Sequence, residues 1–108
     1  MKRVPHLAIV LLVASTLLLA ACGGPDEPTK GDITVYVTVP LSGFQANGGQ
    51  TIVGGAKLAA EHINREGGVD GYRVVVEAID DESDSDVALM VAEEIAAEIQ
   101  GGKNVLGV

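Results

Sequence analysis

Ile33-Thr34-Val35-Tyr36-Val37-Thr38-Val39 is the stretch that decides the fold of this chain. It is rich in β-branched residues, which favour the pleated conformation of a strand. It stops at Pro40, which has no N–H to donate and therefore cannot extend a central strand. The stretch predicts a β-strand over residues 33–39.

An apolar stripe at helical spacing follows this strand. The stripe recurs at i, i+4, i+7 and i+11 and consists of Ile52, Ala56, Ala59 and Ile63, with Val53 and Ala60 beside it. This spacing predicts a helix over residues 49–65 with one apolar face. Gly67-Gly68 comes next, and glycine adopts the left-handed C-cap conformation without penalty, so we expect the helix to end there.

The same alternation continues to the end of the sequence. Asp70-Gly71 predicts a turn into a second strand over residues 72–79. The acidic residues 80–86 open a second helix, with Asp84 or Ser83 as its N-cap. The stripe of this helix is Ala88, Val91, Ile95 and Ile99. Gly101-Gly102 ends it, and residues 105–108 start a third strand.

Strands that alternate with helices of this length imply βαβ units and a parallel sheet. Right-handed crossovers place the first strand between the other two when the sheet is doubly wound. We therefore predict an α/β fold over residues 32–108, namely the opening β-α-β-α-β of a doubly wound parallel lobe. We expect it to be incomplete, because these residues make up about half of such a lobe.

The first 21 residues have the pattern of an export signal. Lys2 and Arg3 precede an apolar segment, residues 7–21, which is too short for a typical membrane-spanning helix. Leu19-Ala20-Ala21-Cys22 resembles the bacterial lipobox. The resemblance implies cleavage before Cys22 and attachment of a diacylglycerol to its thiol. The alternatives are a plain secretory signal with an incidental cysteine, or an uncleaved anchor.

Cys22 is the only cysteine of the chain, and lipidation would account for a lone cysteine in an exported protein. Residues 22–31 are rich in glycine and proline and have no apolar side chain able to pack, so we expect a flexible tether there. The predicted organisation is a lipoprotein signal peptide over residues 1–21, the tether, and the α/β lobe. The predicted location is the outer face of a cytoplasmic membrane, or a periplasm.

Charge restricts the partners. Without Lys2 and Arg3, five basic residues remain against fifteen acidic ones, a formal charge of about −10. Nucleic acid requires clustered Lys and Arg and is therefore not an expected partner. Electrostatic docking on anionic lipid is disfavoured for the same reason, so the acyl chains would have to provide the anchoring.

The sequence favours neither a cofactor nor a metal. Gly49 and Gly54 have phosphate-loop spacing, but Gly55-Ala56 stands where the motif requires Lys and then Ser or Thr. An EF-hand starting at Asp80 would need glycine at Ser85 and glutamate at Val91. A structural role for the acids at the helix start is the better interpretation.

Catalysis has little support in the sequence. His62 is the only histidine after the signal and falls within the predicted helix, where a surface or packing role is expected. No serine lies in a nucleophile-elbow pattern. We therefore predict that the protein is not an enzyme.

Four segments follow one another in the order and spacing of a known family: Val39-Pro40-Leu41-Ser42-Gly43, Gly55-Ala56-Lys57-Leu58-Ala59 with Ile63-Asn64, Gly67-Gly68-Val69-Asp70-Gly71, and Asp80-Asp81-Glu82-Ser83-Asp84. Together they resemble the opening of the leucine/isoleucine/valine-type substrate-binding proteins of ABC transporters, which have the type I periplasmic binding fold. The resemblance implies two lobes that close on a small ligand and deliver it to ABC transporter permease subunits.

The resemblance also implies a ligand-binding segment over residues 41–50. Its expected ligand contacts are Ser42, Gly43, Phe44, Asn47, Gly48 and Gln50. Gly48 stands where many relatives have an aromatic residue against the ligand, and Phe44 stands where relatives often have proline. Either Phe44 replaces that aromatic ring or the pocket accepts a different ligand.

The expected function is that of a lipid-anchored solute-binding component of an ABC importer for amino acids or similar carboxylate or zwitterionic ligands. Two alternatives keep the same residues. One is a ligand-sensing, receptor-type domain of the same fold, and the other is a truncated lipoprotein with no binding function of its own.

Overall fold

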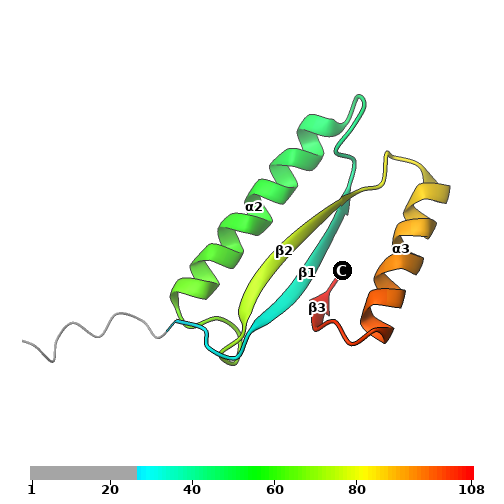
Figure 1. Ribbon diagram of the computed structural model, residues 1–108. Helices are drawn as coiled ribbons and strands as arrows, with labels where there is room; N and C mark the ends of the chain where they lie inside the picture. Colours follow the sequence, from blue (N-terminus) through cyan, green and yellow to red (C-terminus); the bar gives the residue numbers. More distant parts are fainter. Residues whose placement is uncertain (1–26) are drawn as a thin grey trace, which may run out of the picture.

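The computed structural model describes residues 27–108 (Figure 1). The elements in chain order are β1 (Asp32–Val39), α2 (Ala46–Arg65), β2 (Arg73–Asp80), α3 (Ser85–Gln100) and β3 (Val105–Gly107). The predicted signal peptide and Cys22 lie outside the described residues.

The three strands form one parallel sheet in the order β2-β1-β3, so the prediction of a central first strand is confirmed. β1 and β2 pair along their whole length, from Asp32 opposite Arg73 to Val39 opposite Asp80. β3 is short and pairs only near Thr34 and Val35, with a shift in register between them. The crossover from β1 to β2 and the crossover from β2 back past β1 to β3 run in opposite directions, which places α2 and α3 on opposite faces of the sheet, as Figure 1 shows. The predicted α/β doubly wound arrangement is therefore present.

Helix α2 packs on the sheet through a line of small residues. Its buried residues are Gly49, Val53 and Ala60. Ile52 and Ile63, which the stripe predicted to be buried, are 56% and 39% exposed. The small residues allow α2 to approach the sheet closely, whereas Ile63 lines a hollow beside Leu106 of β3. Because β3 has only three residues, it leaves this hollow open to water.

Helix α3 covers the other face of the sheet and completes the buried core. Val91 and Ile95 pack against Tyr36 of β1, which is 2% exposed. Two of the four predicted stripe positions are therefore buried, whereas Ala88 and Ile99 are exposed. Burial of Val91, Ile95 and the Tyr36 ring removes apolar surface from water and holds α3 to the sheet.

The turns follow the predicted chemistry. α2 ends at Arg65, and Gly67 and Gly68 have φ angles of 98° and 74°. Asp70 and Gly71 also have positive φ, 50° and 82°, and they close a tight turn into β2. Both are residue types that adopt this region at low cost.

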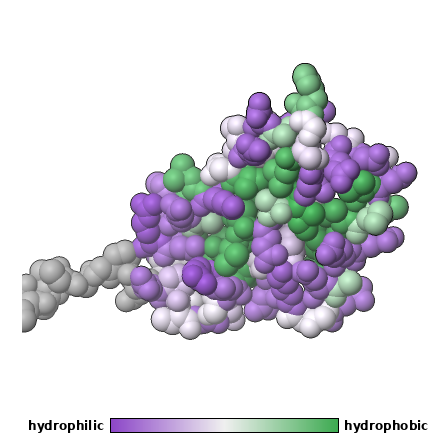
Figure 2. Space-filling view, turned by 45° about the horizontal axis from the view of Figure 1, so that its top comes forward, coloured by the Kyte–Doolittle hydropathy of each residue, from purple (hydrophilic) through white to green (hydrophobic). Residues whose placement is uncertain are grey.

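Apolar surface remains open around the sheet. Figure 2 shows green side chains between purple ones on the face it presents. A hollow of about 240 Å³ between α2 and the sheet is lined by Val35, Ala56, Ile63 and Leu106, among others. Leu106 and Val108 at the end of the chain are 50% and 73% exposed.

Candidate functional site at the carboxyl edge of the sheet

Two loops open at the same edge of the sheet. Residues 40–45 connect β1 to α2, and residues 81–84 connect β2 to α3. Because β1 and β2 are parallel and in full register, their carboxyl ends lie side by side. This edge, called the carboxyl edge below, is where open α/β sheets bind ligands.

Asp80, the last residue of β2, joins the two loops. Its Oδ1 accepts hydrogen bonds from the Leu41 N–H at 2.8 Å and from the Glu82 N–H at 2.9 Å. The Leu41 N–H, followed by the Ser42 hydroxyl and the Glu82 N–H, lowers the pKa of Asp80 below its usual value. Asp80 therefore stays ionised at neutral pH and holds the start of the candidate segment in place.

Sequence reasoning assigned the acids of residues 80–86 to the start of a helix and missed this link. The link depends on the pairing of Val39 with Asp80, which puts the Asp80 carboxylate within reach of the first loop. A strand-terminal aspartate opposite a loop is the signal that could have found it, but only once the parallel register is known.

Two acids of the second loop also bind backbone groups. Asp84 is the N-cap of α3 and accepts from the N–H groups of Asp86 and Val87, which confirms one of the two predicted caps. The Asp81 carboxylate accepts from the Ser83 N–H at 2.9 Å. Within residues 27–108, no group of three His, Cys, Asp or Glu side chains is placed to hold a metal ion.

The six predicted ligand contacts divide between the loop and the helix. Ser42, Gly43 and Phe44 lie in the loop, whereas Asn47, Gly48 and Gln50 lie in α2, which begins at Ala46 rather than at Gly49. All six are exposed at the same end of the molecule. The Phe44 side chain is fully exposed, at 103% of its reference area.

The early start of α2 has a physical cause in Gly49. A Cβ atom at Gly49 would lie 1.9 Å from the Pro40 carbonyl oxygen and 3.4 Å from a methyl carbon of Val39. The missing side chain lets the first turn of α2 rest directly on the end of β1. The sequence prediction treated Gly48 as loop, whereas packing of Gly49 against Pro40 keeps this turn helical.

The first turn of α2 is electrostatically open. No side chain caps its N-terminus, and it contains no acidic residue. The N-terminus of α3, by contrast, is occupied by Asp84. A helix start of this kind favours a negatively charged ligand group such as a carboxylate.

The carboxyl edge is an open surface, because all six predicted ligand contacts on it are exposed. A hollow of about 710 Å³ lies at the other end of the sheet, where Asp32, Asn64 and Arg73 are among its lining residues. A ligand resting on residues 42–50 would therefore remain open to water on its other side. Neither helix of the described part is both long and apolar enough to cross a membrane.

Comparison with known proteins agrees with this architecture. A family described as periplasmic binding protein matches residues 32–100. The chain is 34% identical over 97 residues to Leu/Ile/Val-binding protein homolog 3 of Brucella melitensis, a match that covers 90% of this chain and 26% of that protein. It is also 34% identical over 93 residues to Leu/Ile/Val-binding protein homolog 1 of Brucella abortus, covering 86% of this chain and 24% of that protein.

The chain thus spans about a quarter of the length of these curated relatives. No solved structure matches it. The family match includes β1, α2, β2 and α3, the elements that build the carboxyl edge. This chain therefore belongs to the periplasmic binding protein family.

Proposed function

We propose that this chain is the amino-terminal part of a lipid-anchored solute-binding component of an ABC importer, and that residues 42–50 form one wall of its ligand site. The observation that carries the proposal is the family match over residues 32–100, combined with two loops tied together by Asp80 at the carboxyl edge. The proposed ligands are amino acids or similar small carboxylates. The relatives are named as Leu/Ile/Val-binding proteins.

The ligand class is supported by the chemistry of the edge. The uncapped start of α2 offers a positive helix end to a carboxylate. The Ser42 hydroxyl, which lies beside the Asp80 carboxylate, can donate to the same group once it turns away from Asp80, and the free ring of Phe44 can pack on an apolar side chain. These features suit a small molecule with one charged end and one apolar end.

Ligand binding tests the site directly. Titration calorimetry of the longest polypeptide that contains this sequence should show binding of a branched-chain amino acid or a related zwitterion. Phe44→Ala should weaken binding by about 1–3 kcal/mol, the usual scale for loss of a buried aromatic contact. Ser42→Ala should cost about 1 kcal/mol if its hydroxyl bonds the ligand.

A matched control lies on the same helix but outside the site. Lys57→Ala removes an exposed side chain from the middle of α2 and should leave the affinity unchanged. If Phe44→Ala and Ser42→Ala also leave affinity unchanged, residues 42–50 only connect β1 to α2.

The anchor is tested separately. In a bacterial host fed a radiolabelled fatty acid, the wild-type chain should incorporate label. Cys22→Ser should remain an unprocessed, unlabelled precursor, because its hydroxyl is not a substrate for the thioether chemistry that the lipobox implies. Equal labelling of both chains would contradict the lipid attachment at Cys22.

A further inference from the structure

The last residues before β1 are held against the folded domain. The Lys30 N–H donates to the Gly71 carbonyl at 3.0 Å, and the Arg73 N–H donates to the Gly31 carbonyl at 2.8 Å. The Lys30 ammonium also lies 5.8 Å from the centre of the Tyr72 ring, within range of a cation–π contact. Pro28 packs on the same turn, because its Cγ lies 3.0 Å from where a Cβ of Gly68 would stand. We call residues 28–31 the strap, because these contacts hold the chain to the turn between α2 and β2.

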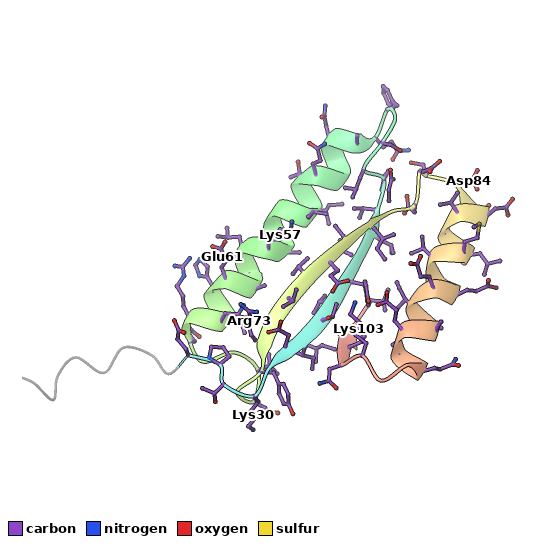
Figure 3. The ribbon with its side chains drawn as sticks, in the orientation of Figure 1. Lys30, Lys57, Glu61, Arg73, Asp84 and Lys103 are labelled. Carbon is purple, nitrogen blue, oxygen red and sulfur yellow. The ribbon has the colours of Figure 1, made fainter. Side chains whose placement is uncertain are left out.

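The strap lies at the opposite end of the sheet from the candidate site. It leads into the first residue of β1, whereas the loops of the carboxyl edge follow the last residues of β1 and β2. Figure 3 places Lys30 and Arg73 at the end where the chain enters the domain, and Asp84 at the other end. The length of β1, eight residues, separates the two ends by roughly 25 Å.

The strap shortens the free part of the tether. Six residue steps separate Cys22 from Pro28, and an extended chain spans at most about 3.3–3.6 Å per step, which gives roughly 20 Å. Without the strap, the ten steps from Cys22 to Asp32 would span roughly 35 Å. The shorter reach is less than the distance from the strap to the carboxyl edge, whereas the longer one exceeds it.

Charge adds to this asymmetry. Residues 80–86, at the carboxyl edge, contain five acids and no basic residue. Three of the five basic residues that follow the signal, Lys30, Arg65 and Arg73, lie towards the strap end, where they offset most of the charge of Glu27, Asp32, Glu66 and Asp70. An anionic lipid surface repels the acidic edge more than the strap end.

We infer that the strap fixes the orientation of the lobe on a lipid surface, with the strap end towards the bilayer and residues 42–50 towards the water. The inference rests on the proposed attachment of lipid at Cys22. An inverted lobe, with its carboxyl edge on the bilayer, would hold Pro28 farther from the lipid than six residues can reach. Inversion therefore requires release of the strap.

Tryptophan quenching on vesicles tests this orientation. The chain contains no tryptophan, so Phe44→Trp and Glu66→Trp each place a single probe at an exposed position, one at each end of the lobe. A chain that starts at Cys22 is coupled through its thiol to maleimide lipid in zwitterionic vesicles whose headgroups carry a nitroxide quencher. Glu66→Trp should lose most of its emission, whereas Phe44→Trp should keep most of it.

Variants of the strap show whether the strap or the charge distribution sets the orientation of the lobe. Lys30→Pro removes the N–H that bonds Gly71 and should bring the quenching of the two probes closer together. Thr29→Pro is the matched control, because the Thr29 N–H makes no hydrogen bond within residues 27–108, and it should keep the difference. Inserting six Gly/Ser residues after Gly24 leaves the folded residues untouched and should also raise quenching of the Phe44→Trp probe.

Equal quenching of the two probes in the unmodified chain overturns the inference. So does a difference that persists in both the Lys30→Pro chain and the lengthened chain. Because the lipid is attached chemically, these outcomes do not depend on whether a host acylates Cys22. Failure of the native anchor would be seen only in the fatty-acid labelling of Cys22→Ser and the wild type.

Discussion

Replacing Gly49 with alanine tests the contact that seats α2 on the end of β1. The new Cβ would lie 1.9 Å from the Pro40 carbonyl oxygen. An ordinary carbon–oxygen contact is about 3.3 Å or longer, so the first turn of α2 or the Pro40 backbone must shift by roughly 1.4 Å. Overpacking of this kind costs about 1–3 kcal/mol. The better helix propensity of alanine returns about 1 kcal/mol, which leaves a net loss of up to about 2 kcal/mol.

Gly54→Ala is the matched control on the same helix. A Cβ at Gly54 has no neighbour within 4 Å, so only the helix propensity changes and stability should rise by up to about 1 kcal/mol. The assay is urea unfolding followed by circular dichroism, with amide hydrogen exchange of α2 as a local measure. The two substitutions should change stability in opposite directions. If Gly49→Ala stabilises the protein as much as Gly54→Ala does, the close packing of α2 on Pro40 is wrong.

Two further predictions concern the contact of Asn64 with β2 and the polar contacts of Glu98 with Lys103 and Tyr36. The Asn64 side chain donates to the Val74 carbonyl at 2.8 Å and accepts from the Val74 N–H at 2.7 Å. Asn64→Ala should therefore lower the free energy of unfolding by about 1–3 kcal/mol and speed hydrogen exchange of the Val74 amide about 5- to 150-fold. An unchanged exchange rate would show that these two hydrogen bonds contribute nothing to stability. The Lys103 ammonium, 2.7 Å from the Glu98 carboxylate, and then the Tyr36 hydroxyl lower the pKa of Glu98. A lowered folded-state pKa gives stability that is present above the unfolded value and lost as the pH falls, so stability should decline below about pH 4.5 and Glu98→Gln should flatten that decline in acid unfolding titrations. If the Glu98→Gln protein loses as much stability in acid as the wild type does, other carboxylates cause that loss.

The order of the elements could be predicted because each depends on local signals. The β-branched run of residues 33–39, the double glycine after Arg65 and the acidic opening of α3 each specify their own element without help from distant residues. Alternation of these elements then restricts the sheet to parallel pairing with β1 in the centre. The predicted start of α2 was three residues late, because contact with Pro40 outweighs the low helix propensity of Gly48 and Gly49.

The faces of the helices were predicted less well than their existence. In both helices the predicted apolar stripe is wider than the part of the helix surface that packs on the sheet. Periodicity alone therefore did not separate the buried residues of each stripe from the exposed ones. In α2 the small residues Gly49 and Ala60 pack inwards while Ile52 remains exposed. Hydrophobicity favours the larger side chain at the centre of the interface, but the closest helix–sheet approach requires the smaller one.

The sequence by itself determined that this chain has an α/β fold of alternating strands and helices, and its resemblance to a known family gave the hypothesis that residues 41–50 line a ligand site. Only the tertiary structure decided how this candidate segment is held, because the Asp80 carboxylate reaches Leu41 through a register that pairs residues about forty positions apart. It also decided that Pro28, Lys30 and Gly31 lie against the turn before β2 instead of hanging free. Local propensity is encoded residue by residue, whereas contacts between distant segments exist only after the strands have paired.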